Sequence, residues 1–427
     1  MNGPGTAEDG PGMARGHSER TIVLLVAAVQ FVNILDFVMV MPMGPQFAAA
    51  LGIPISQLGS IGGSYTAAAA LSGLACSAFI DRFDRRKALA VAMLGLVCGT
   101  ALAGFARGMG SLMLARVVAG IFGGPATSLS FSIIADVVPP ERRGKATGVV
   151  MGSFSVAQVL GVYSGLLLAE NFGWRAPFFA VAGLGALVAA GAIFLLPALT
   201  GHLTAVRAGK AGLVDLIKKP LVLASWATTS VVMIAGFVLI PNIAGYLQVN
   251  LGFPFARLKW LYAAGGLASL ISTQVSGRLV DRIGSFRTGT LGALLVVAVV
   301  YGGFAVQPPL FPVLALFVGF MFAMGMRNVA YNALATKVPL PGERARFMSI
   351  QSAVQHFSSA AGAFLSSRML GQAADQSLVG VPRVAMVSIA LSLVIPLLLR
   401  LVEGGVLRRD RGAVALAVEP APRGQVG

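Results

Sequence analysis

Apolar runs of about 20 residues recur along almost the whole chain, separated by short polar stretches. A helix of that length spans the hydrocarbon core of a lipid bilayer. Hydrophobic residues make up 56% of the chain and charged residues only 11%, whereas soluble domains carry about 25% charged residues. The sequence therefore predicts an all-α integral membrane protein, because helices satisfy every backbone polar group within lipid.

Twelve runs meet this length requirement. Their approximate limits are 21–44, 57–80, 88–106, 111–137, 145–169, 176–199, 220–249, 258–280, 288–306, 311–337, 345–370 and 382–402. The most polar internal stretch lies between the sixth and the seventh run. We expect two six-helix bundles (21–199 and 220–402), a cytoplasmic linker (200–219), a disordered cytoplasmic tail (1–20) and a second cytoplasmic tail (403–427).

Most Lys and Arg residues lie in the loops on one side of these runs, for example Arg142, Arg143, Lys218 and Lys219. Cytoplasmic loops are enriched in such residues, so this side and both termini are predicted to be cytoplasmic. Membrane orientation thereby explains the net charge of +16, and no nucleic-acid partner is expected, since the basic residues occur in small groups. The expected location is a bacterial inner membrane.

Two landmarks recur 200 residues apart: Asp81-Arg82 returns as Asp281-Arg282, and Val138-Pro139 returns as Val338-Pro339. Equal spacing of unrelated landmarks indicates a tandem duplication. Each Asp-Arg pair lies in a short charged loop between apolar runs. Duplicated halves of this kind are typical of membrane transporters, whose two bundles are related by pseudo-symmetry.

The first charged loop, SAFIDRFDRRK, resembles the loop signature of the major facilitator superfamily. Four residues match it, and Ser77 and Asp84 stand where the family usually has glycine; the matches are Asp81, Arg82, Arg85 and Arg86. The second copy has both glycines, but Ser285 replaces an arginine. The resemblance implies twelve helices around a central cavity, a monomer, and a small-molecule substrate.

In that family the loop is thought to latch the cytoplasmic gate through acid and arginine contacts. The resemblance assigns this role to Asp81, Arg82 and Arg85, with Asp136 at the inner end of helix 4 as partner, and to Asp281 and Arg282 in the second copy. An Arg that bridges two acids stabilises a closed gate. The alternative is that the basic residues only follow the positive-inside rule.

Helix 4 contains LMLARVVAGIFGG, which resembles drug and proton antiporters in Arg116 and Gly120. An arginine inside a span costs about 2.5–3.5 kcal/mol on insertion scales, so it should pair with an acid or face a cavity. Asp36 is the only acid well inside a span, at a similar depth. We expect Asp36 to bind the coupling proton while Arg116 favours its charged form. The alternative is a static ion pair.

Further polar residues lie within the apolar runs. Gln30 and Asn33 share a face of helix 1 with Asp36. Helix 10 carries Arg327, Asn328, Tyr331 and Asn332, and helix 11 carries Gln351, Gln355 and His356. We predict that these residues contact substrate, with His356 as a proton relay. The alternatives are hydrogen bonds between helices and a packed histidine.

Helix 5 contains GVYSGL, in which Gly161 and Gly165 match an antiporter signature while Val162 and Leu166 depart from it. We expect these glycines, like Gly120, to permit close helix packing.

The leading prediction is proton-coupled export of a drug-like compound, sugar or metabolite by alternating access. The alternatives are a symporter or facilitator that imports a metabolite, and a membrane sensor without transport. No metal-ligand, phosphate-loop or catalytic motif is found, so neither a cofactor nor an enzyme activity is predicted.

Overall fold

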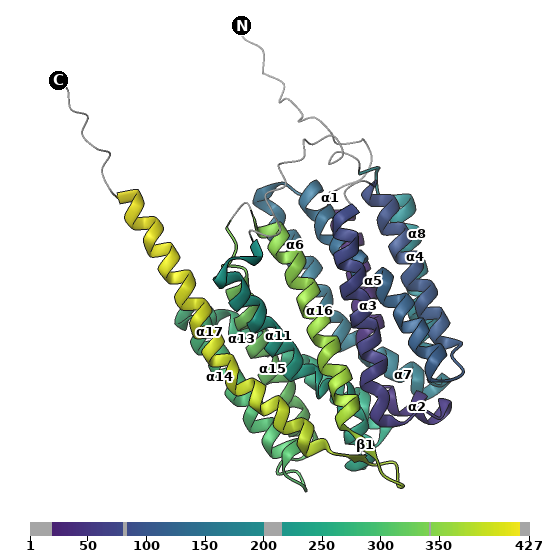
Figure 1. Ribbon diagram of the computed structural model, residues 1–427. Coiled ribbons are helices and arrows are strands. Elements are labelled where there is room, and N and C mark those ends of the chain that lie inside the picture. Colours follow the sequence, from purple (N-terminus) through teal and green to yellow (C-terminus); the bar gives the residue numbers. More distant parts are fainter. Residues whose placement is uncertain (1–18, 80–82, 200–215, 341–342, 419–427) are drawn as a thin grey trace, which may run out of the picture.

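The computed structural model describes residues 19–79, 83–199, 216–340 and 343–418 (Figure 1). This part of the chain is almost entirely helical, and the long helices run side by side along one bundle. Residues 1–18 of the predicted tail (1–20), residues 200–215 of the predicted linker (200–219) and the last nine residues lie outside the described residues.

The helices of the first half are α1 (Glu19–Val38), α2 (Gly44–Leu51), η1 (Ile55–Gln57), α3 (Leu58–Phe79), α4 (Arg85–Gly104), α5 (Met109–Val137), α6 (Pro140–Val156), η3 (Ala157–Gly161), α7 (Val162–Phe172) and α8 (Ala176–Leu195). The segment η3 is a π-helical turn that joins α6 and α7 into one long helix. Helix α5 packs against α3, α4 and α1, and α8 packs against α4 and α1.

The elements of the second half are α11 (Pro220–Phe237), η4 (Ile240–Asn242), α12 (Ile243–Gly245), η5 (Tyr246–Asn250), α13 (Phe255–Ile283), α14 (Ser285–Val300), η6 (Tyr301–Ala305), α15 (Val313–Ala335), α16 (Arg344–Met369), β1 (Gly371–Gln372), β2 (Leu378–Val379) and α17 (Val381–Val418). Strands β1 and β2 form an antiparallel hairpin. When consecutive helical pieces such as α6, η3 and α7 are counted as one segment, the described residues form six long segments in each half, as predicted.

Three boundaries differ from the predicted limits. Helix α1 ends at Val38 rather than at residue 44, and α11 ends at Phe237 rather than at 249. Prolines explain both breaks, since Pro42 and Pro241 lack a backbone donor and disfavour helix in the residue before them. Helix α17 continues past residue 402 to Val418, so the predicted second tail begins as helix.

Nine described helices are long and apolar enough to cross a membrane by length and composition alone. The three remaining segments are α3, α13 and α16, which are rich in Gly, Ser, Thr or charged residues. These same helices contact the opposite half: α3 packs on α16, and α13 packs on α7 and η3. These three helices are less apolar than the other nine because part of their surface faces the opposite half instead of lipid.

The two ends of the bundle differ. Helix α1 begins and α17 ends at one end, which we call the termini end, while α2 and the hairpin β1–β2 lie at the other, the far end (Figure 1). Hydrogen bonds join the halves at the far end. Gln46 Nε2 donates to Gln248 Oε1 at 2.6 Å, the Ile55 amide donates to Gln372 Oε1 at 2.9 Å, and the Ser60 amide donates to Ser367 Oγ at 2.8 Å.

Aromatic and charged contacts strengthen this closure. The rings of Phe37 and Phe237, which are 200 residues apart, stack with centroids 6.1 Å apart. Lys259 of α13 pairs with Glu170 of α7, and Tyr163 lies against Trp260. These contacts hold the halves together at the far end.

Candidate proton-coupling and substrate site

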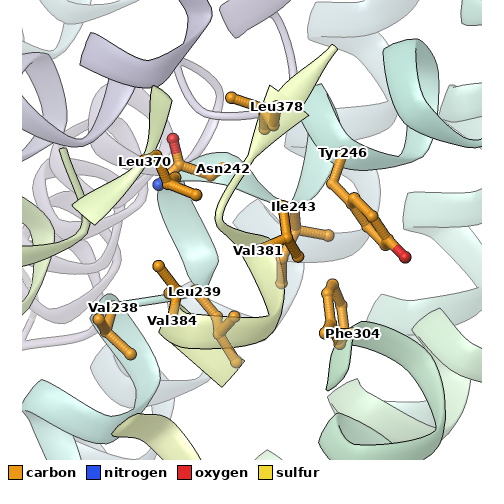
Figure 2. A pocket seen from close by; sticks show the side chains of 10 residues that line it. All are labelled: Val238, Leu239, Asn242, Ile243, Tyr246, Phe304, Leu370, Leu378, Val381 and Val384. Atoms are coloured by element: carbon orange, nitrogen blue, oxygen red, sulfur yellow. The ribbon is translucent and has the colours of Figure 1, made fainter. Parts of the chain in front are cut away.

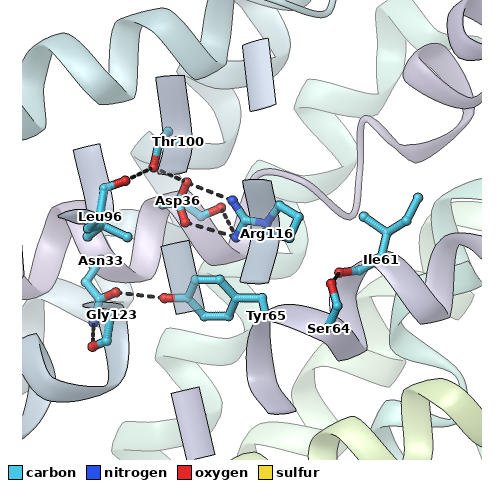
Figure 3. A network of polar contacts seen from close by, with 9 residues as sticks. All are labelled: Asn33, Asp36, Ile61, Ser64, Tyr65, Leu96, Thr100, Arg116 and Gly123. Atoms are coloured by element: carbon cyan, nitrogen blue, oxygen red, sulfur yellow. Dashed lines mark hydrogen bonds and ion pairs between the residues drawn. The ribbon is translucent and has the colours of Figure 1, made fainter. Parts of the chain in front are cut away.

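Asp36 and Arg116 form a buried ion pair between α1 and α5 (Figure 3). Arg116 Nη1 donates to Asp36 Oδ1 and Nη2 donates to Oδ2, both at 2.9 Å. The exposed fractions of Asp36 and Arg116 are 0% and 1%. The structure thus brings together the two charged residues that sequence depth alone placed at similar levels.

Neighbouring polar groups complete the surroundings of this pair. Thr100 of α4 donates to Asp36 Oδ1 at 2.7 Å, so each carboxylate oxygen accepts at least one hydrogen bond. The guanidinium of Arg116 lies 4.6 Å above the ring of Tyr65, an arrangement that favours a cation. Helices α1, α3, α4 and α5 therefore meet at a single carboxylate.

Asn33 ties α1 to α3 and α5 one turn before Asp36. It donates to the Gly123 carbonyl at 3.0 Å and to Thr127 Oγ1 at 2.7 Å, and it accepts from the Tyr65 hydroxyl at 2.8 Å. These contacts are the helix–helix hydrogen bonds that the sequence left as the alternative for Asn33. Gln30 is also buried, but its Oε1 accepts no hydrogen bond within the described residues.

A buried ion pair of this kind constrains both partners. The charges have lost their hydration, and removal of one partner alone leaves an uncompensated charge at a cost of about 3–5 kcal/mol. Asp36 also lies two residues before the end of α1, where the chain turns into α2. The carboxylate thus couples the end of α1 to α5 and, through Phe37 and Phe237, lies next to the contact between the halves.

The polar residues of helices 10 and 11 form a second cluster. Gln355 of α16 donates to the Tyr331 hydroxyl of α15 at 2.8 Å and lies 3.4 Å from Asn332 Oδ1. Gln351 donates to Thr229 of α11 at 2.7 Å. Asn332 is exposed, and Asn328, Gln355 and His356 are half-buried. The cluster therefore offers polar groups to solvent while it links three helices.

Arg327 lies at the back of this cluster and is fully buried. Its Nη2 donates to the Val232 carbonyl at 3.3 Å and to Met324 Sδ at 2.9 Å. Its Nε and Nη1 have no hydrogen-bond partner within the described residues. Unlike Arg116, it faces no carboxylate there.

One pair of the residues predicted for the latch is in contact. Arg85 Nε donates to Asp136 Oδ2, and the two form an ion pair between the start of α4 and the end of α5. Asp81 and Arg82, however, lie outside the described residues. In the second half, Asp281 and Arg282 are described and exposed at the end of α13.

Helix caps explain one departure from the family loop. Asp84 accepts from the Arg86 amide at 3.0 Å and from the Leu199 amide at 3.1 Å, so it caps α4 and holds the end of the first half. Gly284 occupies the matching place in the second half. There Glu403 of α17 accepts from the amides of Ser285 and Phe286 instead.

The predicted packing glycines differ in how tightly they are enclosed. A Cβ on Gly120 would lie 2.3 Å from the Tyr65 carbonyl oxygen, and one on Gly161 would lie 2.6 Å from Leu35. Gly165 has only an ordinary contact, 3.7 Å from Met39. Close approach is thus a property of Gly120 and Gly161.

A small pocket lies near the far end, within the second half (Figure 2). Mainly apolar side chains surround it, from the broken seventh segment, η6, the region of the hairpin and the start of α17. Two polar groups of the lining bond other helices: Asn242 Nδ2 donates to Ser366 Oγ at 2.9 Å, and the Tyr246 hydroxyl donates to the Gly303 carbonyl at 3.0 Å. The mainly apolar lining and the lack of charge make it a packing defect beside the helix break.

The sequence did not single out Thr100, Tyr65 or Thr229. Each is a hydroxyl residue in a mainly apolar run, and Ser and Thr in helices usually bond their own helix. Only their position opposite a charged or amide side chain gives them a role. For Thr100, the sequence did offer one signal: its depth in its helix is similar to the depth of Asp36 in helix 1.

Two helical halves of matching topology, joined at one end around buried charges, define a membrane transporter. The family model of the Major Facilitator Superfamily matches residues 26–363. The chain belongs to the major facilitator superfamily, as its charged loop predicted.

Several curated proteins are similar to this chain. The chloramphenicol resistance protein of Streptomyces lividans is 27% identical over 65% of this chain and 70% of its own length. The purine ribonucleoside efflux pump NepI of Escherichia coli (strain K12) is 26% identical over 65% of this chain and 68% of its own length. Multidrug resistance protein 3 of Bacillus subtilis is 30% identical, but the match spans 33% of this chain and only 28% of that protein.

Solved structures share the fold. A bacterial homologue of the human lysosomal transporter Spinster, in an inward-facing and unoccupied conformation, superimposes with a TM-score of 0.71 at 17% identity, over 92% of this chain and 98% of that one. A D-xylose–proton symporter gives a TM-score of 0.70 at 18% identity, over 88% and 97% of the two chains. At these identities the likeness concerns the fold alone.

Proposed function

We propose that this protein exports a small organic solute in exchange for protons by alternating access. The observation that carries the proposal is the fully buried carboxylate of Asp36, held by Arg116 and Thr100. An acid inside a membrane span costs free energy, so its presence there favours a functional role. The efflux proteins among the similar sequences favour export over import.

In this proposal, proton binding to Asp36 weakens its attraction to Arg116, because a guanidinium binds a neutral carboxyl group less strongly than a carboxylate. Release of Arg116 frees α5 from the end of α1. The Phe37–Phe237 contact lies directly beside this point, so the change in protonation biases the contact between the halves. Proton movement can then drive solute movement through the difference between the two gate states.

We further propose that both termini are cytoplasmic and that the membrane is a bacterial inner membrane. The basic residues Arg85, Arg142 and Lys219 gather at the termini end, which supports this orientation. Closure at the far end then corresponds to an inward-facing conformation. The half-buried and exposed polar residues of α15 and α16, namely Gln355, Asn328 and Asn332, are the proposed substrate contacts, and the protein acts as a monomer.

Reconstitution into vesicles with an imposed pH gradient tests the proposal. Chloramphenicol, inosine, D-xylose and benzoate serve as probes, and accumulation is measured in both directions. The wild type should move at least one probe against its gradient, driven by protons. Asp36→Asn should abolish this drive, while Asp375→Asn, which alters an exposed loop acid, should not. Retained gradient-driven accumulation by Asp36→Asn would refute proton coupling at this site, and movement in the same direction as protons would identify a symporter.

A further inference from the structure

The duplication places Gly236 where the first half has Asp36, 200 residues earlier. Both residues lie at the end of the first helix of their half, since α1 ends at Val38 and α11 ends at Phe237. Phe37 and Phe237, the next residues, stack on each other, which confirms that the two positions are equivalent in space. The second half therefore lacks a carboxylate at the position that the first half uses for its ion pair.

An arginine nevertheless reaches this position. A Cβ atom built on Gly236 lies 3.4 Å from Arg327 Nη2, so the guanidinium adjoins the place where a side chain at residue 236 would begin. Two acceptors contact Arg327 Nη2: a backbone carbonyl at 3.3 Å and the thioether of Met324. A thioether is a weak acceptor. Nε and Nη1 of Arg327 have no hydrogen-bond partner within the described residues.

A guanidinium stays charged in proteins, and a buried charge without a partner is costly. Among the described residues, Asp36 is the one acid well inside a span, and it is already engaged by Arg116 and Thr100. No described acid is left for Arg327, so we look to a bound ligand for the opposite charge.

We propose that Arg327 binds the carboxylate, or an equivalent planar anion, of the transported solute in the space beside Gly236. This inference rests on the proposed transport function and narrows its substrate class to small organic anions. A carboxylate accepts two parallel hydrogen bonds from a guanidinium, as Asp36 does from Arg116. The solute then completes in the second half the pair that the protein itself completes in the first.

Met324 is the side chain that covers this space. Its Sδ accepts from Arg327 Nη2 at 2.9 Å, and its Cε would lie 2.8 Å from a Cβ on Gly236. A methionine side chain is unbranched and adapts easily, so in this proposal the anion takes the place that the Met324 side chain now fills. Phe237 adjoins Gly236 and contacts the first half, which puts the anion next to the closure between the halves.

The test supplies the missing acid within the protein. Gly236→Asp should pair with Arg327, and Gly236→Asn is the matched variant of nearly the same shape without charge. Thermal unfolding of the purified full-length protein in lipid nanodiscs is measured with benzoate or its neutral analogue benzamide as probe. For the wild type, benzoate should raise Tm by about 2–4 °C, and benzamide should leave it unchanged.

Gly236→Asp should raise Tm without ligand, whereas Gly236→Asn should not, because only the carboxylate carries the opposite charge. Both side chains occupy the place assigned to the anion, so both variants should lose the benzoate response, and Arg327→Gln should lose it as well. Equal Tm values of Gly236→Asp and Gly236→Asn without ligand, or equal shifts of the wild type by benzoate and benzamide, would overturn the proposal. Failure of the transport function is distinguishable, because these binding readouts need no pH gradient: a charge-specific benzoate shift without proton-driven transport would retain the anion site and refute only the coupling.

Discussion

Arg116 Nη1 and Nη2 each lie 2.9 Å from a different carboxylate oxygen of Asp36, so one planar fork closes on one carboxylate across 80 residues of sequence. Neither group is open to solvent. Such a pair holds α1 and α5 in one arrangement as long as both groups are charged. It is therefore suited to act as a switch between two arrangements of these helices.

The pair should show strong energetic coupling. Asp36→Asn and Arg116→Gln should each lower stability by about 3–5 kcal/mol, because each leaves one buried charge without its partner. The double variant Asp36→Asn/Arg116→Gln should be much more stable than the sum of the single effects implies. Thermal unfolding of all four proteins gives the coupling energy. Additive losses would show that the two side chains stabilise the fold independently.

The hydroxyl of Thr100 should matter more than its methyl group. Thr100→Val keeps the shape but removes the donor to Asp36 Oδ1, and a hydrogen bond to a charged group contributes about 1.5–3 kcal/mol. Thr100→Ser keeps the donor and serves as control. Unfolding midpoints and gradient-driven transport are compared. If Thr100→Ser loses as much as Thr100→Val, the methyl packing rather than the hydrogen bond is responsible.

Gly59 should be essential for closure at the far end. A Cβ there would lie 2.3 Å from the backbone oxygen of Ala363 in the opposite half, and backbone cannot give way as a side chain can. Gly59→Ala should therefore separate the halves at this end. Gly73→Ala in the same helix is the control, since a Cβ there meets nothing within 4 Å.

Spin labels report this separation. The exposed residues Ala50 of α2 and Ala256 of α13 are replaced by cysteine after Cys76 and Cys98 have been changed to serine. The distance distribution should shift to longer values in Gly59→Ala and stay as in the wild type in Gly73→Ala. An unchanged distribution in Gly59→Ala would mean that the contact between α3 and α16 does not control this gate.

The latch pair should affect rate more than stability. Asp136 is about one-third exposed, and exposed ion pairs contribute about 0–1 kcal/mol. Asp136→Asn should slow transport in vesicles, and the exchange Arg85→Asp/Asp136→Arg should restore part of the rate. Asp410→Asn, which removes an exposed acid beside Arg409, should be neutral. A rate unchanged by Asp136→Asn would leave Arg85 with a purely structural role.

Glu403 should stabilise the start of α14. Glu403→Ala removes the acceptor for the amides of Ser285 and Phe286, and the loss of such a cap costs about 1 kcal/mol. Hydrogen exchange of residues 285–289 should become faster in Glu403→Ala, and much less so in Glu403→Gln, which keeps an acceptor oxygen. Equal protection in wild type and Glu403→Ala would exclude a capping role.

Part of the site was predictable, and the limits have physical causes. Asp36 and Arg116 could be matched because charges are rare inside apolar runs and because helical rise converts sequence position into depth. Asn33 was predicted as a substrate contact, yet it bonds Gly123, Thr127 and Tyr65. Depth is encoded along one helix, whereas the direction of a side chain depends on how neighbouring helices are rotated.

The sequence by itself determined that the chain crosses a membrane, that it consists of two duplicated halves, and that it resembles the major facilitator superfamily. Composition and spacing suffice for these conclusions because lipid permits so few backbone structures. Only the tertiary structure decided which of the two cations lies beside an acid: within the described residues Arg116 does and Arg327 does not. Arg116 meets Asp36, while Arg327 meets Gly236, and that difference arises from side-chain contacts between helices that lie about 80 to 90 residues apart in the chain.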